Sequence, residues 1–247
     1  MIKAIFLDMD DTLIVNHDLY EYACTFLFGY LRNFGVLQEE AQKVFYAKDK
    51  ELFAEYGRSQ KRYPATFEAV LKHFVPEADA EMVSIAREMA TAVFTTVADV
   101  KPGVAEAIDM LTQHFPVYIV TAGDEKVQEF RWEHLPFKDK ISGKFIVEEK
   151  DAKTFGEVVK KLGLKPSEVV MAGDSLKSDI FPAVAAGLQA VWIETFNSQY
   201  ETATGFPEKG AYKFSSLLEM ARLLLEKGKL TAPYAPPKHG PLKRKFG

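Results

Sequence analysis

Residues 1–13 read MIKAIFLDMDDTL, and this stretch decides the fold class that the sequence predicts. The apolar run over residues 1–7 is typical of a buried strand, and Asp8 follows at its carboxyl end. Asp10 and Asp11 come directly after. In an open α/β sheet, ligands bind beyond the carboxyl ends of the strands, near the point where the strand order reverses. We therefore expect Asp8 and Asp10 at a ligand site, although acids at a strand end can also keep it soluble or cap the next helix.

Residues 16–97 change to a helical pattern. Apolar residues recur at i, i+3 and i+4 spacing in two clear stripes, and the second stripe follows Asp79 as a plausible helix N-cap. Weaker helical patterns cover residues 39–56 and 65–74. The stripes comprise Leu19, Tyr22, Ala23, Phe26, Leu27, Tyr30, Leu31 and Phe34, and then Met82, Val83, Ala86, Met89, Val93 and Val97. The sequence thus predicts an all-helical insertion after the first strand.

The later part of the chain alternates between strands and helices. Strands are expected over residues 116–121, 144–147, 169–172 and 190–193, and helices over residues 104–111, 125–133, 152–162, 179–186 and 215–226. This rhythm predicts right-handed βαβ units and a parallel sheet. The expected fold class is α/β, a Rossmann-like, doubly wound parallel sheet with an inserted helical cap domain. Residues 1–15 and 98–227 would form the core domain and residues 16–97 the cap, and residues 228–247 a Pro-rich, basic and loosely attached tail.

Composition excludes several classes of protein. The net charge of −4 argues against a dedicated nucleic-acid or membrane-surface protein, so neither partner is expected. The single cysteine, Cys24, allows no internal disulfide and no Cys-based zinc site. Acids stand where a signal peptide needs an apolar stretch, and no run approaches the roughly 18 apolar residues of a membrane span. We expect a cytoplasmic globular protein that is a monomer or a homodimer.

Three more polar motifs fall at predicted strand ends or helix starts. They are Thr121-Ala122-Gly123-Asp124, Lys150, and the segment from Asp174 to Asp179. Each has an ordinary alternative explanation: a turn for Thr121, a solvated charge for Lys150, and helix capping for Asp174 or Asp179. Their occurrence together around one α/β core favours a shared site.

The residue types in this set suit a phosphoryl group. The acids Asp8, Asp10, Asp174 and Asp179 would repel one another in one crevice unless a cation joined them. Oxygen ligands without His or Cys favour a hard ion such as Mg²⁺. One carboxylate can then attack phosphorus, while a second protonates the leaving oxygen and later activates water.

The remaining members of the set can hold the phosphate oxygens. Lys150 supplies a positive charge and Thr121 a hydroxyl group. Backbone N–H groups around Met9 and Ala122 can complete the cradle. The sequence therefore predicts that Met9, Thr121, Ala122 and Lys150 bind phosphate.

With these four motifs in this order, residues 1–200 resemble the haloacid dehalogenase (HAD) superfamily of aspartyl-nucleophile hydrolases. The resemblance implies that Asp8 is the nucleophile and Asp10 the general acid/base of a phosphatase. It further implies that Asp8, the backbone carbonyl of Asp10, and Asp174 hold Mg²⁺, with Asp179 supporting them. The helical insertion resembles the family's cap, which can close over the substrate and exclude water.

Two positions depart from the commonest family pattern. Asp11 stands at the position where the commonest family pattern has Gly. An acid or Asn at this position also occurs in phosphatase members. The lysine of the third motif usually precedes Pro, whereas Lys150 precedes Asp151. Lys153 is the rival candidate, but the spacing of Lys150 to Phe155 and the following helix fits better.

Asp10 also separates the branches of the family. Halide leaves without a proton, whereas an alkoxide needs one, so a second acid favours phosphate esters. The expected function is a Mg²⁺-dependent phosphatase acting on a small phosphorylated metabolite. Alternatives are a phosphomutase, a phosphonatase or a dehalogenase on the same scaffold, or a non-catalytic protein that binds a phosphorylated ligand or signals.

The substrate itself is not readable from these motifs, because the core fixes the reaction and not the leaving group. Arg32, Arg58, Arg62 and Tyr63 in the insertion are candidates for contacting a polar substrate, with packing inside the cap as the more frequent role of an aromatic residue. Trp192 is interpreted as a packing residue.

Overall fold

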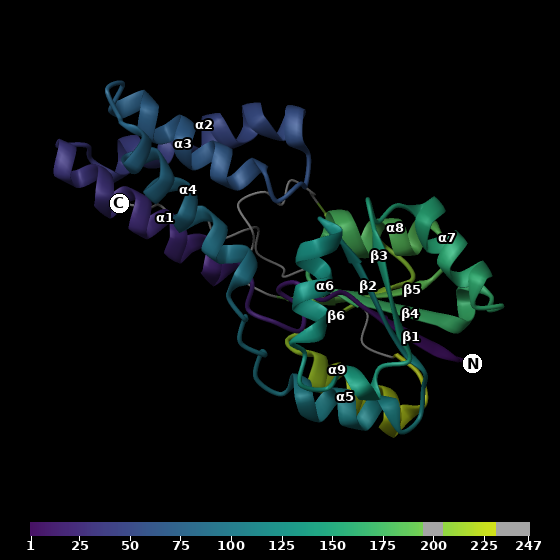
Figure 1. Ribbon diagram of the computed structural model, residues 1–247. Helices are drawn as coiled ribbons and strands as arrows, with labels where there is room; N and C mark the ends of the chain where they lie inside the picture. Colours follow the sequence, from purple (N-terminus) through teal and green to yellow (C-terminus); the bar gives the residue numbers. More distant parts are fainter. Residues whose placement is uncertain (195–204, 231–247) are drawn as a thin grey trace, which may run out of the picture.

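The computed structural model describes residues 1–194 and 205–230, and its centre is a six-stranded sheet in the order β3-β2-β1-β4-β5-β6 (Figure 1). Every neighbouring pair of strands is parallel. The strands are β1 (Ala4–Leu7), β2 (Val117–Ala122), β3 (Gly143–Val147), β4 (Val169–Gly173), β5 (Gln189–Ile193) and β6 (Ala211–Phe214). The chain winds from β1 to one edge and then returns to β4 on the other side of β1. The carboxyl ends of β1 and β4 therefore flank the topological switch point, where α/β sheets bind ligands.

Helices cover both faces of the sheet. On one face, Ile5 and Leu7 share a core with α5 (Val104–Thr112) and α9 (Leu217–Lys227). On the other face, Ala4 and Phe6 pack with α7 (Ala152–Lys161) and α8 (Phe181–Ala185). Alternate residues of β1 thus face opposite layers, and all four residues are buried. The α/β class with a doubly wound parallel sheet is confirmed.

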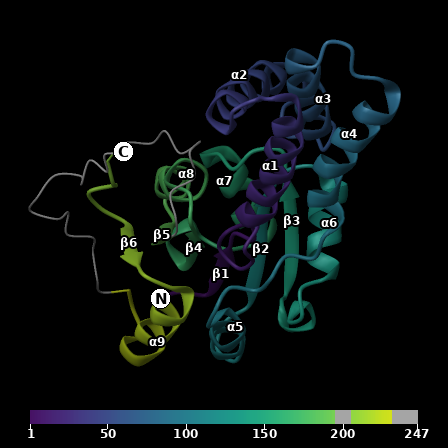
Figure 2. The same ribbon diagram turned by 90° about the vertical axis from the view of Figure 1, so that its left-hand side faces the viewer.

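Four helices between β1 and β2 form a separate bundle, which we call the cap. They are α1 (His17–Leu31), α2 (Gln38–Tyr56), α3 (Arg62–Phe74) and α4 (Ala80–Thr95), and they share their own apolar core around Leu27, Phe45 and Phe67. Asp79 caps α4 as expected, because its side chain accepts a hydrogen bond from the N–H of Met82 at 2.9 Å. Figure 2 shows the bundle to one side of the sheet, with α1 and α4 leading back to it.

Two short linkers join the cap to the sheet and pair with each other. Ile14 and Val100 form an antiparallel bridge. The N–H of Val15 donates to the carbonyl of Asp99 at 2.8 Å, and that of Lys101 donates to the carbonyl of Leu13 at 2.9 Å. The cap is therefore attached through two paired linkers directly behind the acidic segment 8–11.

The structure differs from the expected elements in two places. Strand β6 was not predicted, because four residues with two half-buried members give no clear apolar run. The helix expected over residues 179–186 is instead a π-helical turn (Leu176–Ile180) followed by α8. Such π turns are frequent at functional sites. The predicted tail from residue 231 onward lies outside the described residues.

The other elements are short or peripheral. They are α6 (Glu125–Glu133), which follows β2, and three 3-10 helices, Arg32–Phe34, Lys138–Lys140 and Pro166–Glu168. Among the helices in residues 1–194 and 205–230, none combines the length and the apolar character that crossing a bilayer requires.

Candidate active site

Asp8 follows β1 at the switch point and is buried, with 4% of its surface exposed. Its N–H continues the pairing with β4 by donating to the carbonyl of Ala172 at 2.9 Å. Its two carboxylate oxygens have different partners. Oδ1 lies 2.5 Å from Nζ of Lys150, and Oδ2 accepts a hydrogen bond from the hydroxyl of Thr12 at 3.1 Å. The backbone and both contacts hold the Asp8 carboxylate in one position at the end of the sheet.

Lys150 joins two acids that are far apart in the sequence. Its Nζ lies 2.5 Å from Oδ1 of Asp8 and 2.5 Å from Oδ1 of Asp179. Burial opposes the charge of this ammonium group, but the Asp179 and Asp8 carboxylates outweigh it and raise the pKa of Lys150 above its ordinary value. The side chain of Lys153, the rival candidate, is 82% exposed, and its ion pair among the described residues is with Glu157, at 3.8 Å. The structure thus brings Lys150 to the acids and leaves Lys153 on the surface.

Asp179 reaches this site because the residue at position 173 has no side chain. A Cβ atom on Gly173 would lie 2.3 Å from Cγ of Asp179, which is closer than any real contact. The other oxygen of Asp179 accepts a hydrogen bond from the N–H of Ser175 at 3.0 Å. Gly173 at the end of β4 therefore allows the fully buried Asp179 to pack against the strand and face Lys150.

Three carboxylates form the group that could hold a metal ion. Oxygen atoms of Asp8, Asp174 and Asp179 all lie within 4.8 Å of one another. Burial, with the charges of its neighbours, raises the pKa of Asp8 to about 7 and that of Asp174 to about 8. The positive charge of Lys150 alone cannot balance the negative charge of three carboxylates that are crowded together and buried. A donor set made only of oxygen fits a hard divalent cation, which would neutralise the excess charge.

Two neighbours position Asp174. The indole Nε1 of Trp192 on β5 donates to the backbone carbonyl of Asp174 at 2.7 Å, and the hydroxyl of Thr12 lies 3.4 Å from Oδ1 of Asp174. The interpretation of Trp192 as a packing residue alone was therefore incomplete. Thr12 also contacts Asp8, so one buried hydroxyl bridges both acids. Its place four residues after Asp8 was the only sequence signal for it.

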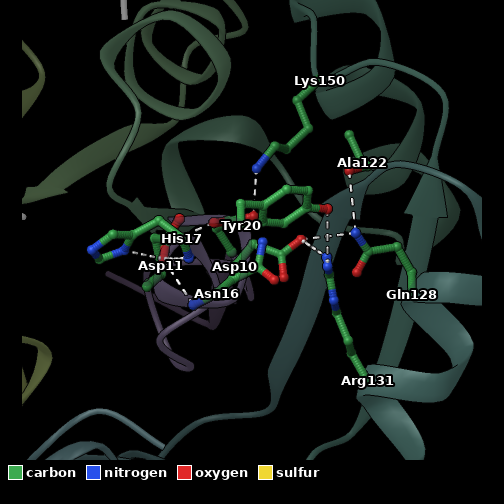
Figure 3. Close-up of polar contacts among 11 residues, drawn as sticks. Asp10, Asp11, Asn16, His17, Tyr20, Ala122, Gln128, Arg131 and Lys150 are labelled. Carbon is green, nitrogen blue, oxygen red and sulfur yellow. Dashed lines mark hydrogen bonds and ion pairs between the residues drawn. The ribbon is translucent and has the colours of Figure 1, made fainter. Parts of the chain in front are cut away.

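Asp10 points to a different set of partners (Figure 3). Its Oδ2 accepts hydrogen bonds from Nε2 of Gln128 at 2.8 Å and from Nη1 of Arg131 at 2.7 Å. Both partners are buried and lie on α6. The sequence did not point to them, because Gln128 and Arg131 are polar residues three apart on a helix, a spacing that is also typical of a solvent-exposed helix face. Burial opposes the charge of Arg131, yet Asp10 and Tyr20 raise the pKa of this guanidinium.

Asp11 has a structural role that explains why this chain has Asp where the commonest family pattern has Gly. Its φ is +58°, in the left-handed region that Gly adopts freely and Asp tolerates better than most residues. Its Oδ1 accepts hydrogen bonds from the N–H groups of Asn16 and His17 at 2.9 and 2.8 Å (Figure 3). These donors begin α1, whose own N-cap Asn16 makes no side-chain capping bond. Asp11 thus caps the first helix of the cap from the sheet side of these linkers.

The remaining predicted phosphate ligands lie around the same sheet edge. Thr121 is 1% exposed at the end of β2, and its hydroxyl is buried without a hydrogen-bond partner among the described residues. Ala122 follows it, and its carbonyl accepts a weak bond from Gln128 at 3.4 Å. The Met9 side chain is buried in the core, so any contact of Met9 with a ligand would be through its backbone. An unpartnered buried hydroxyl at this position is what a phosphate oxygen would satisfy.

The cap reaches this edge of the sheet through the loop between α2 and α3. The N–H of Gln60 donates to Oδ2 of Asp124 at 3.0 Å, and Asp124 is also the N-cap of α6. Arg58, which is exposed, stands two residues earlier in this loop. Arg32 is exposed at the end of α1 and has no contact with this loop among those described.

Two of the cap residues considered for substrate contact have structural partners instead. Nε of Arg62 lies 3.0 Å from Oδ1 of the buried Asp49, and Nη1 donates to the carbonyl of Gly57 at 2.8 Å. Tyr63 is 5% exposed in the cap core, and its hydroxyl donates to the carbonyl of Tyr20 at 2.9 Å. Arg62 and Tyr63 therefore stabilise the cap, which leaves Arg58 as the candidate that lies within the docked loop.

A family model described as haloacid dehalogenase-like hydrolase matches residues 2–187. The chain belongs to the haloacid dehalogenase-like hydrolase family. Its curated relatives include a glyceraldehyde 3-phosphate phosphatase from Methanopyrus kandleri, 29% identical over 202 residues, covering 78% of this chain and 84% of the relative. Another, from Pyrococcus furiosus, has the same name and is 27% identical over 236 residues, with 90% and 93% covered.

Solved structures of the same family share this fold. A HAD-like hydrolase from Xanthomonas campestris has a TM-score of 0.76 and 22% identity, covering 91% of this chain and 95% of its own. The resemblance inferred from the four motifs is thus confirmed at the level of family, fold and hydrolase class. The chemical roles of the individual residues remain predictions.

Proposed function

We propose that this HAD-like hydrolase is a Mg²⁺-dependent phosphatase that acts on a small phosphorylated metabolite. The observation that carries the proposal is a second acid, Asp10, two residues after the buried Asp8 at the switch point. An alkoxide is a poor leaving group and needs a proton, which a second acid can supply. Halide needs none, so a dehalogenase has no use for Asp10 in this role.

In the proposed metal site, the carboxylates of Asp8 and Asp174 and the backbone carbonyl of Asp10 hold Mg²⁺, and Asp179 supports them while paired with Lys150. The clustering of carboxylate oxygens within 4.8 Å and the raised pKa values of Asp8 and Asp174 support this assignment. Bound Mg²⁺ supplies positive charge that lets an anionic nucleophile approach an anionic phosphate.

In the proposed reaction, a carboxylate oxygen of Asp8 attacks phosphorus and the bond from phosphorus to the leaving oxygen breaks. Asp10 gives its proton to that oxygen, and the free alcohol departs. Asp10 then takes a proton from a water molecule, which attacks the aspartyl phosphate and releases inorganic phosphate from Asp8. Lys150 and the hydroxyl of Thr121 bind the non-bridging oxygens, and backbone N–H groups around Met9 and Ala122 complete the cradle.

We propose that the cap covers this site. We infer a core domain of residues 1–15 and 98–227 and a cap domain of residues 16–97 that closes through the paired linkers. The contact of Gln60 with Asp124 supports this assignment, because it docks a cap loop beside Thr121. A closed cap would exclude bulk water from the attacking groups.

The proposed substrate class is a three-carbon phosphate ester. Relatives that align over most of this chain are named glyceraldehyde 3-phosphate phosphatases. Within the docked loop, Arg58 and Lys61 offer positive charge and Ser59 a hydroxyl, which suits a small polar leaving group.

Phosphate release from a panel of phosphorylated trioses, sugars, nucleotides and small acids tests the proposal. We expect turnover that requires Mg²⁺, stops with a chelator, and is fastest with a triose phosphate. Chloride release from 2-chloropropionate serves as the comparison, and we expect none. Chloride release without phosphate release would contradict the phosphatase assignment, whereas phosphate release from another class of ester would contradict only the substrate.

A further inference from the structure

Asp10 is held by one oxygen only. Oδ2 accepts hydrogen bonds from both Gln128 and Arg131, at 2.8 and 2.7 Å, whereas Oδ1 is buried and has no partner in the part of the chain that the structure describes (Figure 3). Both partners of Oδ2 are N–H donors. An O–H group at Oδ2 would face two N–H donors and no acceptor. When Asp10 is protonated, the proton must therefore be on Oδ1.

The two donors are themselves fixed. Gln128 and Arg131 lie three residues apart on α6, which places them on one face of the helix, and they are 2% and 7% exposed. Helix α6 begins at Asp124, directly after the strand that carries Thr121. Helix α6 therefore follows Thr121, a predicted phosphate ligand, and also donates hydrogen bonds to Asp10, the predicted acid.

The cap completes the arrangement. The hydroxyl of Tyr20 on α1 lies 3.3 Å from Nη2 of Arg131, so the guanidinium spans Asp10 and a cap residue (Figure 3). The Tyr20 ring packs edge-on against Tyr63, with centroids 5.0 Å apart, and its carbonyl accepts from the Tyr63 hydroxyl. Tyr20 is thus anchored in the cap core.

We propose that Arg131 and Gln128 are positioning residues that hold Oδ2 of Asp10 and leave Oδ1 to deliver the proton to the leaving oxygen. This inference depends on the proposed function. Without the two donors, the Asp10 carboxyl group can rotate, and the proton no longer faces the leaving oxygen. Neither residue touches the substrate in this assignment, and their effect on the leaving group passes through Asp10.

Two aryl esters that differ by one nitro group separate this role from a structural one. Phenyl phosphate has a basic leaving group that needs the proton, whereas 4-nitrophenyl phosphate leaves readily without it. Replacement of the acid, Asp10→Asn, should lower kcat/KM for phenyl phosphate by roughly 10²- to 10⁴-fold and for 4-nitrophenyl phosphate much less. We compare kcat/KM because it reports the step in which the leaving group departs, whereas kcat also includes hydrolysis of the aspartyl phosphate, which is the same for both esters. We expect Arg131→Met to show the same selective loss, of roughly tenfold or more on phenyl phosphate.

An isosteric variant provides a second change. Gln128→Glu keeps the shape of the side chain but replaces the donor at Oδ2 with an acceptor, so we expect the same selectivity from it. If Arg131→Met does not fold, Gln128→Glu carries the comparison alone. Arg222→Met on α9 is the control and should leave both rates unchanged, because Arg222 pairs with the exposed Glu106 on the surface, away from Asp10.

The double variants complete the test. If Arg131 acts through Asp10, Arg131→Met should cost nothing further in the Asp10→Asn background. Equal losses on both esters, or losses that add in the double variant, would overturn the inference while leaving the phosphatase assignment intact. If the unmodified protein with Mg²⁺ releases no phosphate from either aryl ester or from the panel of phosphorylated metabolites, the proposed function is contradicted, and the inference with it.

Discussion

Lys150 is the only positive side chain for which the structure gives ion pairs to both Asp8 and Asp179, and it is 5% exposed. Its removal leaves two buried carboxylates facing each other, and breaking such a buried pair typically costs about 3–5 kcal/mol. We expect Lys150→Ala to lower the melting temperature and to weaken competitive inhibition by inorganic phosphate. Lys153→Ala, at the exposed rival position, should change neither. A loss of phosphate binding in Lys153→Ala alone would show that the wrong lysine is assigned.

Gly173 permits the approach of Asp179, because a Cβ atom there would lie 2.3 Å from its carboxyl carbon. Gly173→Ala should therefore push Asp179 away from Lys150 and destabilise the protein by about 1–3 kcal/mol. Gly156→Ala is the matched control, since this glycine lies inside α7 with no atom within 4 Å of the added Cβ. That change should stabilise by about 0.5–1 kcal/mol, because alanine favours the helix. Denaturant unfolding of both variants measures the difference, and equal effects would refute the steric argument.

At the scale of elements, α6 connects the cap to the site. Its N-cap Asp124 accepts hydrogen bonds from Lys126 in the helix and from Gln60 in the cap loop. Asp79 caps α4 in the same way but has no contact with the core among those described. Both residues therefore cap a helix, but only Asp124 also holds the cap loop.

This difference gives a paired prediction. Asp124→Ala and Asp79→Ala should each cost about 1 kcal/mol of stability through the lost cap. Only Asp124→Ala should also lower kcat/KM, because it releases the loop that docks over the site. Thermal unfolding and steady-state kinetics on both variants provide the measurement. An equal kinetic loss in Asp79→Ala would attribute the effect to stability rather than to docking.

The elements that sequence could predict are those with a strong periodic signal. The apolar run of β1 and the helical stripes of residues 16–97 give the sheet and the cap, because burial imposes the pattern directly. Strand β6 has no such signal, and the π turn at Leu176–Ile180 depends on how Asp179 packs against Gly173. Long-range contacts of this kind cannot be read from spacing along the chain.

The candidate site divides in the same way. Asp8, Asp174, Asp179 and Lys150 could be named from four motifs at strand ends, since parallel strands bring their carboxyl ends to one edge. Arg131 and Gln128 could not, because only the packing of α6 turns them inward to Asp10. The cap arginine Arg62 was a reasonable candidate until its buried partner Asp49 was seen.

At the scale of the whole molecule, the buried acids link stability to pH and to metal. Without a bound cation, the raised pKa values of about 7 and 8 keep protons on folded Asp8 and Asp174 at pH values where unfolded aspartates, with pKa values of about 4, have lost them. Between these values the folded state binds more protons, so the free energy of unfolding falls as the pH rises. A cation that replaces the protons should reverse this loss.

We therefore expect Mg²⁺ to raise the melting temperature more at pH 8 than at pH 5.5. Each point needs a reference in chelator at the same pH, so that unrelated titrations cancel. Asp174→Asn should reduce this difference, because one of the two carboxyl groups no longer titrates. An equal effect of Mg²⁺ at both pH values would mean that the acid cluster is not where the ion binds.

The rate of Mg²⁺-dependent phosphate release by Asp8→Asn, compared with the unmodified protein, tests the assignment of the nucleophile most directly. An amide oxygen cannot replace the carboxylate as attacking group, so we predict a loss of roughly 10³-fold or more with the fold intact by circular dichroism. Phosphate release by Asp8→Asn at close to the unmodified rate would contradict the covalent mechanism.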